Sequence, residues 1–459
     1  MTGPIFQRRA TAKVGQWRSF PVRPAAAGLA ATLATGLVIP ALAVVGGAGV
    51  AAASARASAA SISPARTGAG RPAAAGGTAA AGTAASGHVL AWGRDDFGQL
   101  GNGTSADARS PVRVRLPGGT KVAQVRAGCN HTVALTSTGH VLAWGINGNG
   151  QLGNGSIASR ETPVRVRIPR GTKVTAVRAG CDFSLALTSR GGVLAWGDNV
   201  YGQLGNDTTT DSHVPVRVQL PAGTKVTAIS AGGSFALART TGGRVLAWGQ
   251  NTNAELGNDS TTSSAVPLRV DLPPGVRVSI ISAGYNFAVA RAVGRPFAYF
   301  AWGANNLGQY GNGSTAGSAS PVGVYYTVRG PGHVHLASLF AGCGHTLALL
   351  SNGAILAWGA GNQGQLGNGT TTSSDAPVLF KLGHTKVTAI SASCDDSYAL
   401  TRNGHVLAWG YDGEGQLGNG GAVNSDTPLR VHLPTGWSAS AVGSGPVAGH
   451  ALAIVHRKA

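Results

Sequence analysis

The sequence contains few charged residues, few aromatic residues and no stretch with clear helical periodicity. Only 12% of its residues are charged and 6% are aromatic, whereas 71 of the 459 residues are glycine. This composition argues against a helical bundle, because helices carry charged outer faces and lose stability at each internal glycine. The composition instead predicts a large β structure with many turns.

Acidic residues are absent from residues 1–86, which contain eight basic residues. Five of these basic residues precede an uncharged stretch that runs from residue 24 to residue 55. A basic region, an apolar core and small residues in an Ala-x-Ala pattern are typical of an export signal. The apolar stretch is also long enough to span a bilayer, so an uncleaved membrane anchor remains the alternative. We therefore expect a secreted or cell-surface protein.

The chain divides into three segments. We assign residues 1–57 to the export signal or membrane anchor, and residues 58–86, rich in Ala, Gly and Ser, to a flexible linker. Residues 87–457 form the folded domain.

Without residues 1–86 the chain still carries a formal net charge of +11. Such a surface favours anionic partners, such as nucleic acid, wall polymers or anionic lipid, without identifying one.

The folded domain consists of seven copies of one motif, of which "AWGRDDFGQLGNG" at residues 91–103 is the first. Successive anchoring tryptophans are 52, 52, 52, 54, 56 and 51 residues apart. They are Trp92, Trp144, Trp196, Trp248, Trp302, Trp358 and Trp409. A fixed period of this size indicates a repeat architecture. An active site is needed once, whereas a turn is needed in every repeat, so the shared polar and glycine residues are interpreted as turns.

Each repeat predicts four short antiparallel strands. In the first repeat these are residues 88–92, 111–117, 121–128 and 131–136, with a Gly- and Asn-rich loop after the first. One such sheet cannot bury both of its faces, but seven sheets arranged radially can. The fold class is therefore all-β, a seven-bladed β-propeller. The lone strands at 87–92 and 449–455 are predicted to pair, so that both termini complete one shared blade and no sheet edge stays open.

The pattern G-x-V-L-A-W-G-x-N-x-x-G-Q-L-G-N-G, followed by P-V and A-G-x-x-H-T-x-A-L, closely resembles the RCC1 repeat (regulator of chromosome condensation). The resemblance covers residues 87–456 and includes the exported RCC1-like propellers of bacteria. It implies a seven-bladed propeller in which the Trp and Gly positions hold the blades together. The founding eukaryotic member is a guanine-nucleotide exchange factor that also binds chromatin, and other members are binding scaffolds. The resemblance thus implies a specific fold but not a specific function.

Catalytic and cofactor-binding patterns are lacking. No nucleophile, base and orienting acid can be assembled from one repeat, and most acids fall in turns. The glycines of "GNGQLG" at 148–153 match a dinucleotide motif in spacing, but no helix follows them. His131, His345 and His450 share a repeat position with Phe183, Phe235 and Phe287, which is typical of core packing. We expect no enzyme activity, no cofactor and no metal.

Four cysteines occupy one repeat position in neighbouring copies: Cys129, Cys181, Cys343 and Cys394. In an exported chain an even number of cysteines favours disulfides, here Cys129–Cys181 and Cys343–Cys394. Bridged Cα atoms must lie within about 7 Å, a limit that equivalent positions on adjacent blades meet only near the central axis. Small buried thiols and metal ligands therefore remain alternatives.

Partner-binding candidates lie where the copies differ or where exposed arginines recur. Two stretches, 291–303 and 321–342, contain extra residues, and their candidate contact residues are Tyr325, Tyr326, Arg329 and Arg295. The outer strands repeat exposed arginines that could form a basic rim, namely Arg113, Arg115, Arg165 and Arg167. The variable letters of the first loop, Arg94 to Phe97, are also expected to be free to contact a partner. Because exposed aromatic residues do not alternate with the arginines, sequence-specific nucleic-acid recognition is not indicated.

These observations favour an exported, monomeric, non-enzymatic binding scaffold whose partner is a protein. Two alternatives remain. One is a regulator similar to a guanine-nucleotide exchange factor, by family analogy, which requires the chain to stay in the cytosol. The other is a propeller that binds cell-wall carbohydrate or an anionic wall polymer.

Overall fold

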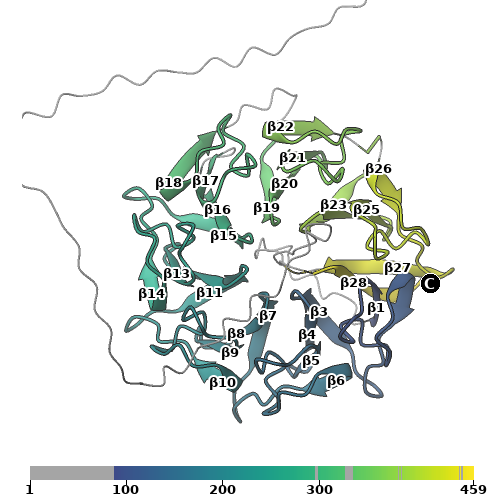
Figure 1. The fold of residues 1–459 in the computed structure, drawn as a ribbon, viewed down its shortest axis with the longest axis horizontal. Helices are drawn as coiled ribbons and strands as arrows, with labels where there is room; N and C mark the ends of the chain where they lie inside the picture. Colours follow the sequence, from purple (N-terminus) through teal and green to yellow (C-terminus); the bar gives the residue numbers. More distant parts are fainter. Residues whose placement is uncertain are drawn as a thin grey trace, which may run out of the picture. The chain divides into compact units, whose positions relative to one another are not determined.

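The computed structural model describes residues 87–294, 298–325, 334–380, 382–383, 385–443, 445 and 448–458. These residues form 28 strands and no helix. The strands make seven four-stranded antiparallel sheets, arranged as blades around a central axis (Figure 1). The expected seven-bladed propeller is confirmed.

In every blade the strand order from the centre outwards is the order of the strands in the chain, apart from the blade that contains both termini. The first three blades are β3 (Val122–Ala127), β4 (His131–Thr136), β5 (Val141–Gly145), β6 (Arg160–Arg165); β7 (Val174–Ala179), β8 (Phe183–Thr188), β9 (Val193–Gly197), β10 (Ser212–Arg217); and β11 (Val226–Ala231), β12 (Phe235–Thr240), β13 (Val245–Gly249), β14 (Ser264–Arg269). The next three are β15 (Val278–Ala283), β16 (Phe287–Ala292), β17 (Ala298–Gly303), β18 (Ser318–Tyr325); β19 (Leu336–Ala341), β20 (His345–Leu350), β21 (Ile355–Gly359), β22 (Ser374–Phe380); and β23 (Val387–Ala392), β24 (Asp396–Thr401), β25 (Val406–Gly410), β26 (Ser425–Arg430).

The seventh blade joins the two ends of the folded domain. Its strands are β27 (Trp437–Gly443), β28 (His450–Arg457), β1 (His88–Gly93) and β2 (Ala108–Arg113). β1 and β28 pair without interruption, from His88 opposite Val455 to Gly93 opposite His450. The predicted ring closure is therefore confirmed, and no blade has an edge left open by the chain termini.

The outer strands begin earlier than the sequence pattern predicts. The pattern predicts the first of them at residues 111–117, but β2 runs from Ala108 to Arg113 and includes Pro111. In the pairing of β2 with β1, Val112 lies opposite Ala91 and Ala108 lies opposite Gly93, so the register shifts between these pairs. This shift marks a bulge in β2 that includes Pro111. A bulge at the sheet edge accommodates proline, which cannot donate a ladder hydrogen bond. The proline thus lies inside the strand instead of starting it.

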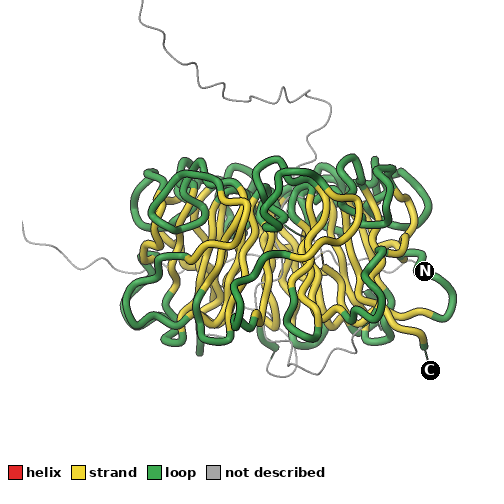
Figure 2. Tube along the Cα trace, turned by 90° about the horizontal axis from the view of Figure 1, so that it is seen from below, coloured by secondary structure: helices red, strands yellow, loops and turns green. Residues whose placement is uncertain are grey.

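The propeller has two distinct faces, which Figure 2 shows at the top and bottom of the blades. We call one the long-loop face. It carries the loops from third to outer strand, such as 94–107, and the tight turns from first to second strand, such as 128–130. The other is the short-turn face, which carries the hairpins from second to third strand, such as 137–140, and the interblade connections, such as 114–121.

A tryptophan clamp joins each pair of neighbouring blades. Trp248 is fully buried, and its indole Nε1 donates a hydrogen bond of 2.9 Å to the Gln203 carbonyl of the preceding blade. The same bond, 2.8–3.0 Å long, recurs at all seven tryptophans. The hydrophobic clusters follow this geometry. One cluster, for example, combines Val133 and Val141 of one blade with Val177 and Trp196 of the next.

The glycine of each Gln-Leu-Gly motif lets the indole ring lie against the backbone. Gly205 has a φ of +62°, and a Cβ placed on it would lie 2.7 Å from Nε1 of Trp248. Gly223 also has a positive φ, +72°, but no atom lies within 4 Å of its Cβ position. The two glycines therefore differ in ring contact and share the same backbone constraint.

We expect Gly205→Ala to lower the free energy of unfolding by about 3 kcal/mol, since it adds a steric clash to the cost of a positive φ. The matched control Gly223→Ala should lower it by only about 1 kcal/mol, the cost of the backbone conformation alone. Guanidinium denaturation of both variants measures the difference. Equal losses would show that the contact between glycine and indole does not stabilise the ring.

Candidate functional site

The two faces of the propeller differ in charge. The chain has 17 acidic residues. All of them except Asp271 lie in the loops and tight turns of the long-loop face or at the strand ends beside them. Most lysines and arginines of the described residues lie at the opposite strand ends and in the loops of the short-turn face, for example Arg113, Lys121 and Arg165. A partner therefore meets opposite electrostatic potentials on the two faces.

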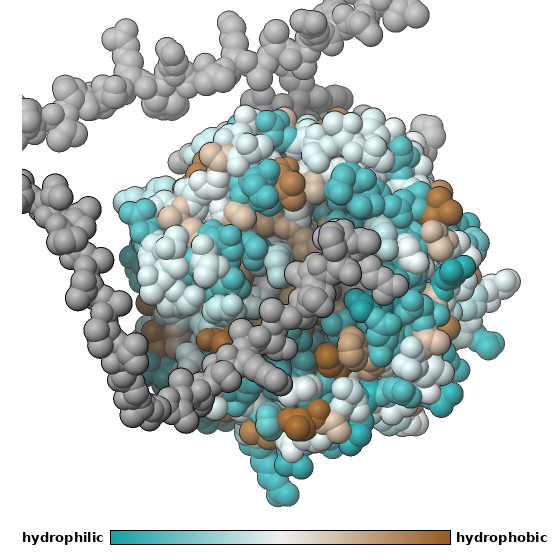
Figure 3. Space-filling view, viewed as in Figure 1, coloured by the Kyte–Doolittle hydropathy of each residue, from teal (hydrophilic) through white to brown (hydrophobic). Residues whose placement is uncertain are grey.

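Apolar side chains are exposed on the long-loop face. Val200 is 60% exposed, Leu307 41%, Tyr201 39% and Tyr285 38%. They come from the loops and turns of the two blades that lie on either side of the β11–β14 blade. Figure 3 looks along the propeller axis and shows apolar side chains as separate brown spots among polar residues. We call Val200, Tyr201, Tyr285 and Leu307 the apolar patch.

Two members of the apolar patch reach across to neighbouring blades. The ring of Tyr285 lies so close to Gly233, on the preceding blade, that a Cβ there would be 2.7 Å from it. Leu307 lies similarly close to Gly344, on the following blade, where the corresponding distance is 2.8 Å. Glycine at 233 and 344 thus provides the space that these side chains occupy. A larger residue at either position would displace them.

Half-buried carboxyl groups lie in the tight turns and long loops of the same face. The Gln151 side-chain amide donates to Asp182 over 3.1 Å, and the Gln365 amide donates to Asp395 over 3.3 Å. Burial raises the pKa of Asp182, and it raises the pKa of Asp395 to about 7. Burial also raises the pKa of Asp198 to about 6. Asp395 and, to a smaller extent, Asp198 are therefore partly protonated near neutral pH and contribute less negative charge than their number suggests.

Two disulfides join tight turns of adjacent blades. Cys129 is bonded to Cys181, and Cys343 is bonded to Cys394. The Cα atoms are 4.5 and 4.4 Å apart, within the limit for a disulfide. The turns between the two innermost strands come close enough because they surround the central axis (Figure 1). Of the alternatives that the sequence left open, the structure contains the disulfides.

The three histidines at the shared repeat position are core residues, as predicted. His131, His345 and His450 are fully buried. The Nε2 atoms of His131 and His345 each lie 2.9 Å from a serine hydroxyl of the next blade, and that of His450 lies 2.8 Å from the Thr132 hydroxyl. Burial lowers the pKa of His131 to about 3. His131 is therefore neutral and helps to hold two blades together.

The expectation that residues 94–97 are free to contact a partner is wrong for Asp95. Its side chain is fully buried, and its Oδ1 accepts a hydrogen bond of 2.8 Å from the Leu100 amide. Asn147 and Asn199 make the same bond in the next two copies. Asp95 therefore organises the loop, because a side-chain acceptor here closes the turn. Arg94 and Asp96 form an ion pair with each other.

The candidate residues in the insertions are only partly described. Tyr325 ends β18 at the short-turn face and is 61% exposed. Tyr326, Arg329 and Arg295 lie outside the described residues. Whether this segment contacts a partner stays a prediction.

The arginines expected to form one basic rim lie at two levels. Arg113 and Arg165 are exposed at the short-turn ends of β2 and β6. Arg115 and Arg167 are also exposed, but their guanidinium groups lie against Gly103 and Gly155 in the long loops. Only the first pair contributes to the short-turn face.

Within the described residues, no group of three or more His, Cys, Asp or Glu side chains is placed to hold a metal ion. The same part of the chain contains no helix that is long and apolar enough to cross a membrane. Residues 1–86, on which the predicted signal and linker fall, lie outside the described residues.

Comparison with known proteins identifies relatives of this chain. The family model for the RCC1-like domain matches residues 57–299 and 169–453. The chain is 31% identical over 342 residues to the ultraviolet-B receptor UVR8 of Arabidopsis thaliana, covering 74% of this chain and 76% of the receptor. It is 28% identical over 368 residues to the human E3 ubiquitin-protein ligase HERC2, covering 80% of this chain but only 8% of the ligase.

Solved structures agree with the fold. Prp20p of Saccharomyces cerevisiae, a protein described with its binding to Gsp1p and histones, superimposes with a TM-score of 0.73 at 23% identity. The match covers 82% of this chain and 92% of Prp20p. Human WBSCR16 gives a TM-score of 0.71 at 24% identity, covering 81% of this chain and 99% of that protein. At these identities the likeness shows the fold alone.

The raised pKa of Asp395 predicts that the propeller loses stability as the pH rises. An unfolded aspartate has a pKa of about 3.9, so between about pH 4 and pH 7 the folded state holds a proton that the unfolded state has lost. Asp395→Asn removes this penalty and keeps an acceptor for Gln365. We expect its Tm to exceed that of the wild type by about 3 °C at pH 8 and to match it at pH 4.

Thermal unfolding at several pH values tests this, with the exposed Asp375→Asn as the control. Burial also raises the pKa of Asp95 to about 7, so the Asp395→Asn variant should keep part of the pH dependence. A pH dependence identical to that of the wild type would contradict the assignment.

The disulfides should stabilise the ring. Each closes a loop of about 50 residues, so reduction should lower the free energy of unfolding by about 2–4 kcal/mol per bond. The double variant Cys343→Ser/Cys394→Ser should show the loss of one bond without added reductant. Denaturation with and without reductant measures both effects, and thiol counting on the unfolded wild type should find no free thiol before reduction.

Proposed function

The chain belongs to the RCC1-like domain family, and on that premise we propose that it is an exported, non-enzymatic binding scaffold that docks a protein on the long-loop face. The observation that carries this proposal is the apolar patch, Val200, Tyr201, Tyr285 and Leu307. Exposed apolar and tyrosine side chains in one region of a mostly polar surface are typical of a protein interface.

The patch is suited to a protein partner for two reasons. Its side chains extend from two different blades on the same face, at positions that do not follow the repeat. Tyr285 has a burial-raised pKa and stays neutral, and it lies near Asp182, whose pKa burial also raises. The raised pKa of Asp182 lowers the cost of covering this region with the apolar side chains of a partner.

Export is supported by the disulfides and by the N-terminal pattern. Structural disulfides persist in oxidising compartments and are rare in the cytosol. The basic and apolar pattern of residues 1–57 is independent of the disulfides and favours the same location. Both observations count against the exchange-factor alternative, which needs a cytosolic GTPase.

A non-enzymatic role is supported by the state of the polar groups at the centre of the ring. The carboxyl groups of Asp182 and Asp395 accept hydrogen bonds from glutamine amides. The histidines are buried between blades and lie within hydrogen-bond distance of hydroxyl groups. Each of these contacts serves the fold, which counts against a role as a base or nucleophile.

We expect Tyr285→Ser/Leu307→Ser to weaken binding of the protein partner at least tenfold, because both apolar anchors are removed. The control is Tyr325→Ser, which changes an exposed tyrosine on the opposite face. The partner is first captured from extracellular protein with the wild-type chain, and its affinity for each variant is then measured by surface plasmon resonance.

Thermal unfolding shows whether each variant keeps the wild-type fold. If Tyr325→Ser abolishes binding and the double variant does not, the partner docks on the insertion at the short-turn face. If wild-type chain is recovered only from the cytosol, export is wrong.

A further inference from the structure

The seventh blade lacks the hairpin that the other blades carry on the short-turn face. Elsewhere the second and third strands are joined by a hairpin, such as 137–140 between β4 and β5. In the seventh blade these strands are β28 and β1, which are held together only by pairing. A groove of about 870 Å³ opens there. The groove beside hairpin 137–140 measures about 470 Å³, and one beside β13 and β14 about 290 Å³. We call the large one the seam groove.

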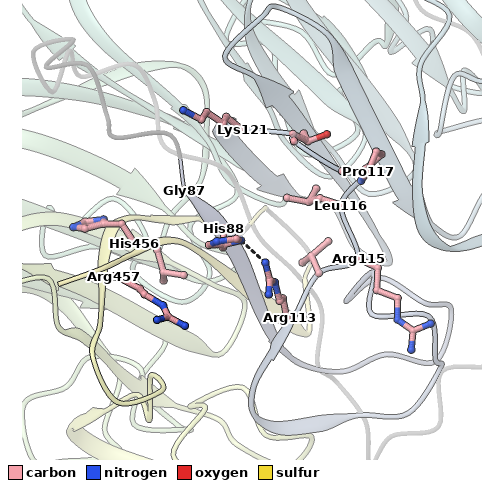
Figure 4. Close-up of a pocket in the computed structure, with 14 residues that line it drawn as sticks. Gly87, His88, Arg113, Arg115, Leu116, Pro117, Lys121, His456 and Arg457 are labelled. Carbon is pink, nitrogen blue, oxygen red and sulfur yellow. Dashed lines mark hydrogen bonds between the residues drawn. The ribbon is translucent and has the colours of Figure 1, made fainter. Parts of the chain in front are cut away.

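Basic side chains surround the seam groove. Arg113, Lys121 and Arg457 line it together with His88 and His456, and none of its described lining residues is acidic (Figure 4). Arg115 also lines the groove, but its guanidinium group lies against Gly103 in the long loop. Within the described residues neither Arg113 nor Lys121 nor Arg457 forms an ion pair. Arg113 instead lies 2.7 Å from the Nδ1 atom of His88. Cations of one sign held this close repel one another, which an anionic ligand would relieve.

The electrostatics of His88 reflect this positive charge. Burial lowers the pKa of His88, and the charges of Arg113 and Arg457 lower it further. The neutral ring can then accept a hydrogen bond from the Arg113 guanidinium. No carboxylate is therefore needed to orient Arg113 toward the groove.

Two further basic grooves continue the seam groove on either side. One is lined by Arg430, His405, His432 and Lys458, the last next to Arg457 in the chain. The other shares residues 117–121 with the seam groove and adds His140 and Arg165. Each measures about 470 Å³, and their described lining residues are also free of acids. Together the three grooves form a basic track across three adjacent blades.

We propose that this track binds a linear phosphate polymer, with the seam groove as its principal site. A polymer spans the three grooves, which a single phosphate ion cannot, and its binding releases condensed counterions. Arginine suits this ligand because its planar donors match phosphate oxygens. The proposal concerns the short-turn face and does not depend on the protein partner proposed for the long-loop face.

The ligand is a polymer without bases, because the residues described around the groove offer no free aromatic ring for stacking. Trp437 adjoins the track, but His88 packs edge-on against its ring at 5.1 Å, and Arg457 lies over it at 5.7 Å. Single-stranded nucleic acids gain much of their affinity from stacking on exposed aromatic rings. A nucleic acid would therefore gain little beyond its phosphates here.

The test is a titration of the full chain with inorganic polyphosphate and with poly(glycerol phosphate) of equal phosphate number, followed by calorimetry. The test variant is Arg113→Gln/Lys121→Gln/Arg457→Gln. The matched control is Arg269→Gln/Arg277→Gln/Arg244→Gln, which removes the same charge from a groove with a complete hairpin. Arg269 and Arg277 occupy the repeat positions of Arg113 and Lys121. Glutamine keeps much of each side chain, and Tm values verify folding.

We expect the test variant to weaken polymer binding at least tenfold and the control by less than threefold. The slope of log affinity against log salt should become shallower by about 2 in the test variant, as three phosphate contacts are lost. The polymer that binds more tightly identifies the source of the phosphate chain. Equal weakening in both variants would overturn the proposal, since it would indicate attraction to net charge alone. Tighter, seam-dependent binding of oligothymidylate than of either polymer would replace it with a nucleic-acid site.

Discussion

The hydrogen bond from each indole Nε1 to the carbonyl of the Gln or Glu on the preceding blade is the interaction on which the ring depends. It lies between blades, where the described sheets are not joined by a strand ladder, and it satisfies a buried donor and a buried carbonyl together. The same carbonyls accept hydroxyl bonds, as at Gln151 and Ser184. His131, on the same blade as Gln151, adds a second link to the Ser184 hydroxyl. Trp and Gly recur in the motif because each is one part of this contact. The Gln side chain has another role, since its Oε1 accepts a bond from the amide two residues earlier, as at Gln203 and Tyr201.

The charge difference between the faces follows from the same repeated geometry. A long loop needs a side-chain acceptor near its start, and Asn147, Asp95 and Asp412 serve this purpose alike. Acids therefore accumulate on the long-loop face through turn chemistry. The outer strands end at the other face, where exposed Arg and Lys keep the sheet edges soluble. Each residue choice is local, but seven copies give the propeller an acidic and a basic face.

Repetition made most of the fold predictable. Seven blades, closure by β1 and β28, and the buried role of His131 all follow from comparing equivalent positions. The bulge at Pro111 could not be predicted, because the alternation of Val and Arg after it is that of a regular strand. The prediction that Asp95 is free is wrong, because one copy of the motif does not distinguish an aspartate that accepts turn hydrogen bonds from one that is exposed.

The candidate site was harder to predict, because it depends on contacts between blades. Val200, Tyr201 and Leu307 fall among the variable letters of the loops, which the sequence did single out as a class. Tyr285 follows an Ala-Gly pair, at a position where other copies carry Cys or Gly. This difference is the sequence feature that distinguishes Tyr285 from its equivalents. The space above Gly233 and Gly344 that positions Tyr285 and Leu307 appears only when the blades are assembled.

A closed ring of equal blades has no preferred place for a partner, so specificity requires a break in the symmetry. This chain has two such breaks on opposite faces. On the long-loop face, disulfides join two pairs of blades, and the residues of the apolar patch lie between the two disulfides in the chain. On the short-turn face, the two ends of the folded domain meet where other blades have a hairpin, beside the seam groove. Closing the ring with strands from both ends secures the sheet edges, and the absence of that one hairpin distinguishes one blade from the other six. The device that stabilises the propeller is thus also the one that gives its basic face a unique position.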